Sequence, residues 1–287
     1  MPELPEVEVL VRHLRPILKD KTITAVAVRR KRVLRPTSPR IFAQRLRGAT
    51  FEDVSRRGKY LLFEMQDEKG KPFTVLGHLG MTGRMFLALE RALVPKHTAV
   101  ILGLGREKFI FEDTRYFGRL TLDTSAVERL GPEPLSAEFT EAAFANAVRR
   151  SSQSIKVKLL DQTVVAGVGN IYASEALFRA GISPRLAACR LKPEQIRRLR
   201  QTIREVLKDA IRFGSTVPLS YVGENGDGLF YFGSDSDALD CYSERLRVYD
   251  RAGEACLRCK TKIKRIVQAA RSTFFCPRCQ GAAMRLR

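Results

Sequence analysis

The sequence predicts a multidomain α+β protein: a β-sandwich or barrel that opens with a helix, then a helical domain, then a small metal-binding tail. The spacing of the apolar residues and the spacing of the cysteines predict this order. Residues 5–18 show apolar residues at helical spacing, residues 21–123 contain short β-rich runs, and helical patterns dominate after residue 134. Two close cysteine pairs near the end of the chain indicate the metal-binding tail.

The first predicted helix spans Pro5 to Leu18, and Pro and Glu crowd its first turn, as is typical of a helix start. Its apolar residues are Val7, Leu10, Val11, Leu14, Ile17 and Leu18. The strands predicted after it are Thr22–Val28, Tyr60–Met65, Phe73–Leu76, Ala99–Leu102 and Phe109–Phe111. Glycine and charged turns separate these strands, as in a sandwich or barrel.

A domain boundary is predicted at residues 131–134, where the sequence is GPEP. The helices expected beyond it are Glu138–Arg150, Ile155–Gln162, Ile171–Ala180 and Pro193–Phe213. Residues 214–243 are rich in Gly, Ser and Asp and are interpreted as a long loop. The predicted domains are therefore 1–131, 132–223, an acidic insert at 224–244, and 245–287.

The charge balance indicates a polyanionic partner, because 51 Lys and Arg oppose 31 Asp and Glu and leave a net charge of +20. Nucleic acid is the first candidate. A protein kept soluble by charge and a ribosome-associated protein are the alternatives. No signal peptide or membrane-spanning run is found, so the cytosol is the expected compartment and no membrane partner is expected.

The cysteine spacing predicts a metal site. Sixteen residues separate the pair Cys256 and Cys259 from the pair Cys276 and Cys279, and each pair has the x2 spacing of a zinc knuckle. Four thiolates leave no open coordination position, so we expect one structural Zn²⁺ and no catalysis by it. Reduced cysteines without metal are the alternative, and the two other cysteines of the chain are expected to be free thiols.

The tail around these cysteines is strongly basic. Residues 245–287 contain 12 Lys or Arg and only two acids. Thr261–Val267 and Arg271–Phe275 can pair as a hairpin, which would lay a β-ribbon on DNA with Arg271 near its second knuckle. A zinc ribbon that binds RNA is the alternative.

The amino-terminal end offers a nucleophile. A small second residue favours removal of Met1, which would leave Pro2 with a free secondary amine. An α-amino group titrates at roughly 7.7–8.0, so part of it is unprotonated and able to attack a sugar carbon at neutral pH. Glu3 lies beside it for proton transfer. The alternative is ordinary capping at the start of a helix.

Six motifs, in order along nearly the whole chain, resemble those of the formamidopyrimidine-DNA glycosylase family. They are MPELPEVE at 1–8, RGKY at 57–60, HLGMTGR at 78–84, DTRYFG at 113–118, AGVGNIYASE at 166–175 and RSTFFC at 271–276. The resemblance implies a bacterial enzyme with a β-sandwich behind an N-terminal helix, a helix-two-turn-helix domain and a β-hairpin zinc finger. It also implies a monomer that acts on the nucleoid.

The resemblance implies a DNA glycosylase and abasic-site lyase that excises oxidised purines, 8-oxoguanine and formamidopyrimidines, in base excision repair. Its partner is double-stranded DNA with oxidised bases or abasic sites. Pro2 attacks C1′ of the lesion sugar, Glu3 moves protons, and Lys59 completes the catalytic set by reaching a phosphate beside the lesion. Glu6, at i+3 from Glu3, is expected to support this site. The alternative for Lys59 is a solvated lysine in a turn, without a catalytic role.

The DNA-binding residues that the resemblance implies lie in four of the motifs, except Lys156, which lies outside all six. Met81, Arg115 and Phe117 would fill the gap that the flipped nucleotide leaves, and His78 opens the first of these loops. From periodicity alone, Met81 and Phe117 would be core residues. The remaining DNA contacts are assigned to Lys156 and Asn170, at backbone phosphates, and to Arg271; a capping role is the alternative for Asn170.

One segment departs from the family pattern. Residues 224–244 carry six acids and no Lys or Arg, and the segment is longer than expected at this place. A disordered, solvated insert is favoured over a loop that covers the flipped base, and Asp235-x-Asp237 is too weak a signal for a calcium site. Two rival functions stay open: an endonuclease VIII-like glycosylase for oxidised pyrimidines, and a non-catalytic DNA-binding protein on the same scaffold.

Overall fold

The computed structural model describes residues 2–214, 219–221, 230–232 and 245–281. The chain divides into two compact units, each described by itself below. Unit 1 consists of Met1–Glu128 with Gly214–Cys241, and unit 2 of Arg129–Phe213 with Tyr242–Arg287. The predicted helical domain and zinc finger therefore form one unit, and the chain between them belongs to unit 1. Met1, Cys241, the Asp235-x-Asp237 pair and most of the acidic insert lie outside the described residues.

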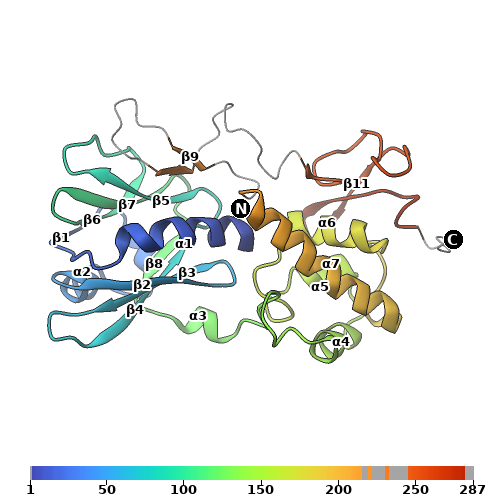
Figure 1. Ribbon diagram of the computed structural model, residues 1–287, viewed down its shortest axis with the longest axis horizontal. Helices are drawn as coiled ribbons and strands as arrows, with labels where there is room; N and C mark the ends of the chain where they lie inside the picture. Colours follow the sequence, from blue (N-terminus) through green and yellow to red (C-terminus); the bar gives the residue numbers. More distant parts are fainter. Residues whose placement is uncertain (1, 215–218, 222–229, 233–244, 282–287) are drawn as a thin grey trace. The chain divides into compact units, whose positions relative to one another are not determined.

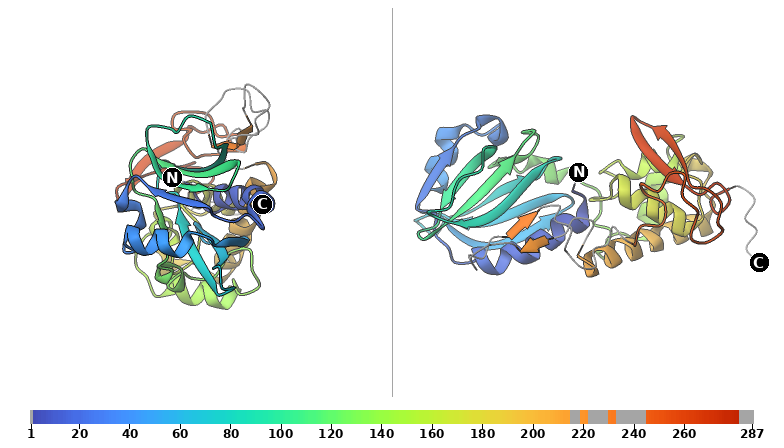
Figure 2. Two further views of the ribbon diagram at one scale, coloured as in Figure 1. Left: turned by 90° about the vertical axis from the view of Figure 1, so that its left-hand side faces the viewer. Right: turned by 90° about the horizontal axis from the view of Figure 1, so that it is seen from above.

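Unit 1 contains two antiparallel four-stranded sheets that face each other as a sandwich (Figure 1, Figure 2). The first sheet has the order β2-β3-β4-β8 and the second the order β1-β6-β7-β5. The strands of the first sheet are Thr50–Arg57, Tyr60–Gln66, Pro72–His78 and Arg119–Thr121. Those of the second are Ala25–Val28, Thr98–Gly103, Glu107–Asp113 and Gly83–Leu89. The predicted sandwich is thus confirmed, although β2, β5 and β8 are absent from the predicted strands.

The core of unit 1 lies between the two sheets and is closed by α1, Leu4–Leu18. In Figure 1 this helix runs at the level between the sheets, and it contacts β2 and β3. Val7, Leu10 and Leu14 have no exposed surface, and they pack with Phe63 and Phe109 from the two sheets. The apolar spacing that predicts this helix therefore marks the face that it buries.

Three short helices complete the connections of unit 1: η1, Lys31–Leu34; α2, Pro39–Leu46; and α3, Ser125–Glu128. The sequence analysis does not predict α2, although it has a helix-start signature. Ser38 caps it by accepting a hydrogen bond from the Ile41 N–H at 3.3 Å, and Pro39 follows at its first position. Two short strands, β9 at Leu219–Tyr221 and β10 at Phe230–Phe232, pair within the segment predicted as a loop.

Unit 2 is built around α6, Asn170–Ala180, most of whose side chains are buried. It packs against α7, Pro193–Arg212, which turns its apolar stripe inward. The other helical elements are α4, Glu141–Arg149; α5, Ile155–Leu159; and η2, Ala188–Arg190. Gly181 ends α6 at φ 66°, the left-handed conformation that glycine adopts without strain.

The tail of unit 2 is a hairpin of β11, Lys264–Gln268, and β12, Arg271–Phe275. β12 begins and ends at the predicted residues and lies against α6. The apolar side of the tail packs on Phe178 of α6, together with Val248 and Ile263. In the described part of the chain, every helix is too short or too polar to cross a membrane.

Candidate active site and DNA-binding surface

The start of α1 holds the predicted nucleophile and its neighbour. Pro2 is half-buried, and Glu3 is 2% exposed and precedes the first turn of the helix. The backbone N–H of Glu3 donates to Oε2 of Glu6 at 2.8 Å. Because that N–H belongs to the Pro2–Glu3 peptide bond, the Glu6 carboxylate fixes the peptide that carries Pro2. The same hydrogen bond therefore caps the helix and fixes Pro2, so the capping interpretation and the catalytic interpretation of this motif are compatible.

Lys59 lies in the tight turn between β2 and β3, where Gly58 has φ 57°, and it is 7% exposed. The turn is tied to α1 by Arg56, which donates through Nη1 to the Gly58 carbonyl at 2.9 Å and through Nε to Glu8 Oε2 at 2.8 Å. Arg56 thereby fixes the turn that carries Lys59 to the helix that begins beside Pro2. The burial of Lys59 argues against the solvated turn lysine.

Glu8 and Arg56 hold the segments that carry the predicted catalytic residues, and the sequence analysis assigned them no role. Burial alone would raise the pKa of Glu8, but hydrogen bonds from Arg56 and Arg12 hold it below its ordinary value. The carboxylate therefore stays charged and keeps its hold on both guanidinium groups. Forty-eight residues separate the main pair, and although Glu8 ends the first motif, nothing in the sequence pairs it with Arg56, so only the fold reveals the contact.

His78 ends β4 and opens the first predicted DNA-facing loop. Its Nδ1 accepts a hydrogen bond from the Gly80 N–H at 3.1 Å, and its ring lies 4.8 Å from that of Tyr60. Burial, then the charges of Lys59 and Arg119, lower the pKa of His78 to about 4, although Asp113 opposes the shift. The ring is therefore neutral at physiological pH, with Nε2–H as its donor.

Met81 and Phe117 are exposed, at 45% and 44%, so their interpretation as core residues is wrong. Arg115 is also exposed, and its guanidinium carbon lies 4.9 Å from the centre of the Phe117 ring. All three side chains stand on loops of unit 1. An apolar thioether, an aromatic wedge and a hydrogen-bonding guanidinium are thus available at the surface.

Asp113 joins the two loops that carry these side chains. It has no exposed surface, and its Oδ1 accepts from Thr82 Oγ1 at 2.6 Å and from the Arg115 N–H at 3.2 Å. Its Oδ2 accepts from the Gly118 N–H at 2.7 Å. One buried carboxylate therefore holds the Met81 loop and the Arg115–Phe117 loop as a single block. The sequence analysis quoted Asp113 in a motif but assigned it no role.

The same two loops pack backbone to backbone. Gly80 has φ 61°, and a Cβ there would lie 2.6 Å from the Gly118 nitrogen. A Cβ at Gly118 would lie 2.7 Å from the His78 carbonyl oxygen and 2.6 Å from the Phe111 ring. Both positions therefore require glycine, because any side chain would push the loops apart.

In unit 2, Lys156, which the sequence analysis assigns to a backbone phosphate, lies inside the protein. It is completely buried, and its Nζ donates to Asn170 Oδ1 at 2.6 Å and to Thr273 Oγ1 at 3.4 Å. Asn170 in turn donates through Nδ2 to the Ser272 carbonyl at 2.9 Å. Gly169, not Asn170, is the N-cap of α6, so the capping interpretation of Asn170 is wrong. The Lys156 ammonium instead links α5, α6 and β12.

Glu175 is a second buried charge of unit 2 that the sequence analysis left without a role. Its carboxylate accepts three backbone hydrogen bonds, from Arg247, Val248 and Tyr249, at 3.0, 2.9 and 2.9 Å. Burial raises the pKa of Glu175, although the three N–H groups oppose the shift. The contact fixes the chain that leads into the cysteine-bearing tail onto α6.

Cys256, Cys259, Cys276 and Cys279 converge as predicted, with their four sulfur atoms within 4.8 Å of one another. The Cys256–Cys279 and Cys259–Cys276 sulfur separations are 3.9 and 3.4 Å. Tetrahedral zinc with Zn–S bonds of about 2.3 Å requires sulfurs roughly 3.8 Å apart, so the cluster fits this ion. Arg271 is exposed at the start of β12. Cys189 is a free, exposed thiol, as predicted.

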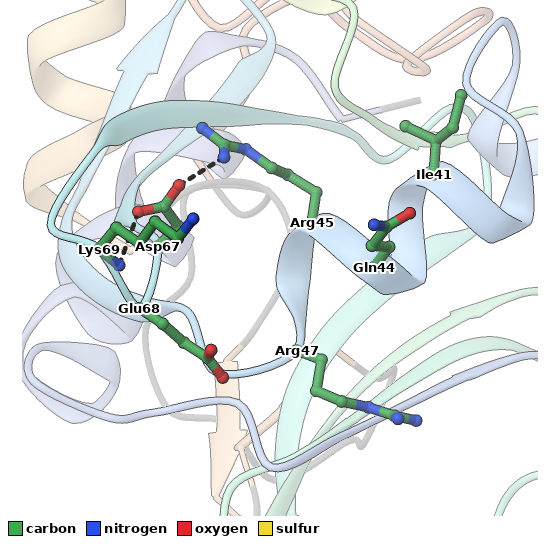
Figure 3. A pocket seen from close by; sticks show the side chains of 7 residues that line it. All are labelled: Ile41, Gln44, Arg45, Arg47, Asp67, Glu68 and Lys69. Atoms are coloured by element: carbon green, nitrogen blue, oxygen red, sulfur yellow. Dashed lines mark hydrogen bonds and ion pairs between the residues drawn. The ribbon is translucent and has the colours of Figure 1, made fainter.

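One pocket of unit 1 contains none of the predicted site residues. It lies between α2 and the β3–β4 turn and has a volume of about 440 Å³ (Figure 3). Asp67 at its rim accepts a hydrogen bond from Arg45 Nη1 at 2.5 Å and two more from the backbone N–H groups of Lys69 and Lys71. These bonds, the one from Lys71 first, lower the pKa of Asp67 despite some burial. Donors from the turn and from α2 thus satisfy the carboxylate, which is a structural role.

Comparisons with known proteins agree with this arrangement. Three family models match: the formamidopyrimidine-DNA glycosylase N-terminal domain at residues 1–120, the H2TH domain of the same enzyme at 130–220, and the zinc finger found in FPG and IleRS at 253–281. Formamidopyrimidine-DNA glycosylases of Desulfitobacterium hafniense and Listeria innocua are 40% and 37% identical to this chain. Each alignment covers 98% of this chain and 100% of the relative.

Solved structures are similar over the same length. The complex of Lactococcus lactis Fpg with DNA containing an abasic site has a TM-score of 0.85 at 34% identity, over 97% of this chain and 99% of that one. A structure of MutM with DNA containing carbocyclic 8-oxo-G has a TM-score of 0.84 at 34% identity, over 98% and 100%. The zinc-finger match identifies the four cysteines as the site of one structural zinc ion. The chain therefore belongs to the formamidopyrimidine-DNA glycosylase family.

Proposed function

We propose that this protein excises oxidised purines, 8-oxoguanine and formamidopyrimidines, from duplex DNA in base excision repair and then nicks the strand as an abasic-site lyase. The observation that carries this proposal is the placement of Pro2, which directly precedes the buried Glu3 and whose peptide is fixed by Glu6 at 2.8 Å. The family's curated relatives carry the same enzymatic name over their full length.

The chemistry begins at Pro2, whose amine must be free of Met1. Its lone pair attacks C1′ of the lesion sugar, the bond from C1′ to the base breaks, and the base departs with a proton. Glu3 is the group that supplies or holds this proton as the sugar ring opens. The product is an iminium between the Pro2 nitrogen and C1′, so no oxidant or reductant is consumed.

The iminium then serves as an electron sink. Loss of a proton from C2′ expels the 3′ phosphate, and loss of a proton from C4′ expels the 5′ phosphate, so the two eliminations leave a one-nucleotide gap with phosphate ends. Water finally releases the sugar fragment from Pro2. The ammonium of Lys59, held in its turn by the Arg56 contact, is assigned to a phosphate beside the lesion.

The remaining residues bind DNA. Met81, Arg115 and Phe117 occupy the gap left by the flipped nucleotide, which offsets part of the cost of unstacking, about a few kcal/mol. The neutral His78 donates a hydrogen bond to the DNA through its Nε2–H. Asn170 and Arg271 contact backbone phosphates, and the buried Lys156 orients Asn170. Zinc bound by the four cysteines folds the tail and supplies no chemistry.

A strand-cleavage assay on two duplexes tests the proposal. One contains 8-oxoguanine opposite cytosine and the other 5-hydroxyuracil. We expect gapped product with phosphate ends mainly from the first duplex, loss of it in Glu3→Gln, and wild-type rates in Glu52→Gln, a matched change at an exposed strand position. Cleavage of only the pyrimidine duplex would indicate an endonuclease VIII-like specificity. Binding of both duplexes without product would indicate a non-catalytic protein.

A further inference from the structure

Tyr116 stands between Arg115 and Phe117 and has an unusual backbone. Its φ is 52°, the left-handed conformation, which brings the Cβ of a residue other than glycine too close to the following carbonyl oxygen. Such a conformation persists only where the surroundings hold it. The loop therefore contains strain at the residue that separates the two side chains assigned to the DNA stack.

Three contacts hold the Tyr116 side chain. Arg30 Nε donates to its hydroxyl at 3.2 Å, and the guanidinium carbon of Arg30 lies 5.3 Å from the ring centre. The hydroxyl lies 3.5 Å from Nδ1 of His97. Since the arginine can only donate, the phenol hydrogen is available for His97. The hydroxyl therefore accepts from Arg30 and donates to His97. The ring also packs against the sandwich core.

The partners of Tyr116 are themselves anchored by the backbone. The Arg30 N–H donates to the Ala99 carbonyl at 3.1 Å, and the His97 carbonyl accepts from the Asp113 N–H at 3.1 Å. The clamp on the phenol therefore connects the loop to β6 and β7 of the sandwich. Arg30 and His97 lie far from Tyr116 in the sequence, at separations of 86 and 19 residues.

We propose that Tyr116, clamped by Arg30 and His97, is a positioning residue that holds Arg115 and Phe117 ready for insertion into the DNA stack. With the Tyr116 ring packed on the core, the side chains on either side of it stay exposed, and Arg115 stacks on Phe117 at 4.9 Å. Preassembly removes the cost of ordering the pair when it enters the duplex. This inference rests on the proposed DNA-repair function but not on its chemistry.

The test measures insertion without chemistry. A duplex carries a tetrahydrofuran abasic analogue opposite 2-aminopurine, whose fluorescence reports entry of side chains into the stack after mixing. Tyr116→Phe removes only the hydroxyl, and Arg30→Gln replaces the guanidinium group that donates to it with a shorter, uncharged side chain. Arg29→Gln is the matched control, because it removes the same charge from the exposed neighbouring residue, which is not part of the clamp.

We expect Tyr116→Phe and Arg30→Gln each to slow insertion about 3- to 10-fold, and the double variant to be no slower than the slower single variant, because both remove the same contact. Arg29→Gln should weaken binding without slowing insertion. Unchanged insertion in Tyr116→Phe, with Arg30→Gln behaving like Arg29→Gln, would overturn the inference. Wild-type protein that inserts but leaves 8-oxoguanine duplexes uncut would contradict the proposed function and leave this inference standing.

Discussion

The side chains of unit 1 that we assign to DNA are exposed, with Met81 at 45% and Phe117 at 44%, whereas in unit 2 the predicted phosphate ligand Lys156 has no exposed surface. Each unit nevertheless has a buried charged group that holds neighbouring segments together. In unit 1 it is the carboxylate of Asp113, which accepts three hydrogen bonds from two loops. In unit 2 it is the ammonium of Lys156, which donates to α6 and β12.

The difference teaches that a DNA-binding motif contains two kinds of residue. Some are assigned to contacts with nucleic acid, and others are buried and hold the first kind in place. A sequence motif does not distinguish them, because both occur in the same short stretch. The experiments below separate the two kinds, beginning with the change expected to have the largest effect.

The largest effect is expected from loss of the metal in unit 2. Cys276→Ala deletes one of four ligands from a buried cluster, so the tail should lose zinc and unfold, with DNA affinity falling about 100-fold or more. Metal analysis and DNA titration measure this. Cys189→Ser, at an exposed thiol outside the cluster, is the matched control. One bound zinc per chain and full affinity in Cys276→Ala would contradict this assignment.

Asp113→Asn tests the buried charge of unit 1. The amide that replaces one carboxylate oxygen cannot accept from its N–H and O–H donors, so unfolding should become easier by about 1–3 kcal/mol. Insertion measured with 2-aminopurine should slow as well, because the two loops are no longer one block. Glu112→Gln, the same change at the half-buried neighbour on β7, should have little effect on either measurement. Equal effects of the two variants would show that Asp113 has no special role.

Lys156 and Arg271 can be compared by the salt dependence of DNA binding. Arg271 is exposed, so Arg271→Gln should reduce the slope of log affinity against log salt by about 0.9, the value for one phosphate contact. Lys156→Met keeps the packing of the aliphatic stem and should weaken binding at every salt concentration without changing the slope. A reduced slope in Lys156→Met would mean that this ammonium leaves its buried place and binds phosphate directly.

At neutral pH the smallest expected effect is that of His78, because its contribution changes only as the pH falls. Its pKa of about 4 in the folded protein lies below the ordinary 6.5, so the unfolded chain takes up a proton first as pH falls. The free energy of unfolding should therefore decrease between pH 6.5 and pH 4, by up to about 1.4 kcal/mol per pH unit from this group. His78→Asn keeps an acceptor for Gly80 and should show a shallower decrease. Parallel pH curves for the two proteins would argue against the buried neutral ring.

Much of the fold follows from the sequence where one pattern dominates. α1 was predicted within one residue of its start, and β12 at its observed limits. β2 was missed because its two buried residues, Phe51 and Val54, are three positions apart across a register shift, so the strand lacks the alternating pattern. β5 was missed because its first residues belong to a motif interpreted as a loop.

The sequence predicts which residues form the site but not the contacts that hold them in place. The motifs identify Pro2, Lys59 and the four cysteines, and the structure places the cysteines together as expected. The Arg56–Glu8 contact and the burial of Lys156 depend on segments distant in the sequence. Tertiary packing determines such contacts, so periodicity and spacing cannot predict them.

The central claim is that the Pro2 amine is the nucleophile, and borohydride trapping tests it most directly. Wild-type protein and Pro2→Gly are incubated with a duplex containing 8-oxoguanine opposite cytosine, reduced, digested and analysed by mass spectrometry, beside intact-mass analysis of the free protein. We predict a chain that lacks Met1 and a sugar adduct on the peptide that begins at Pro2, with less adduct in the variant. An adduct on a lysine, or efficient trapping by protein that retains Met1, would contradict the account.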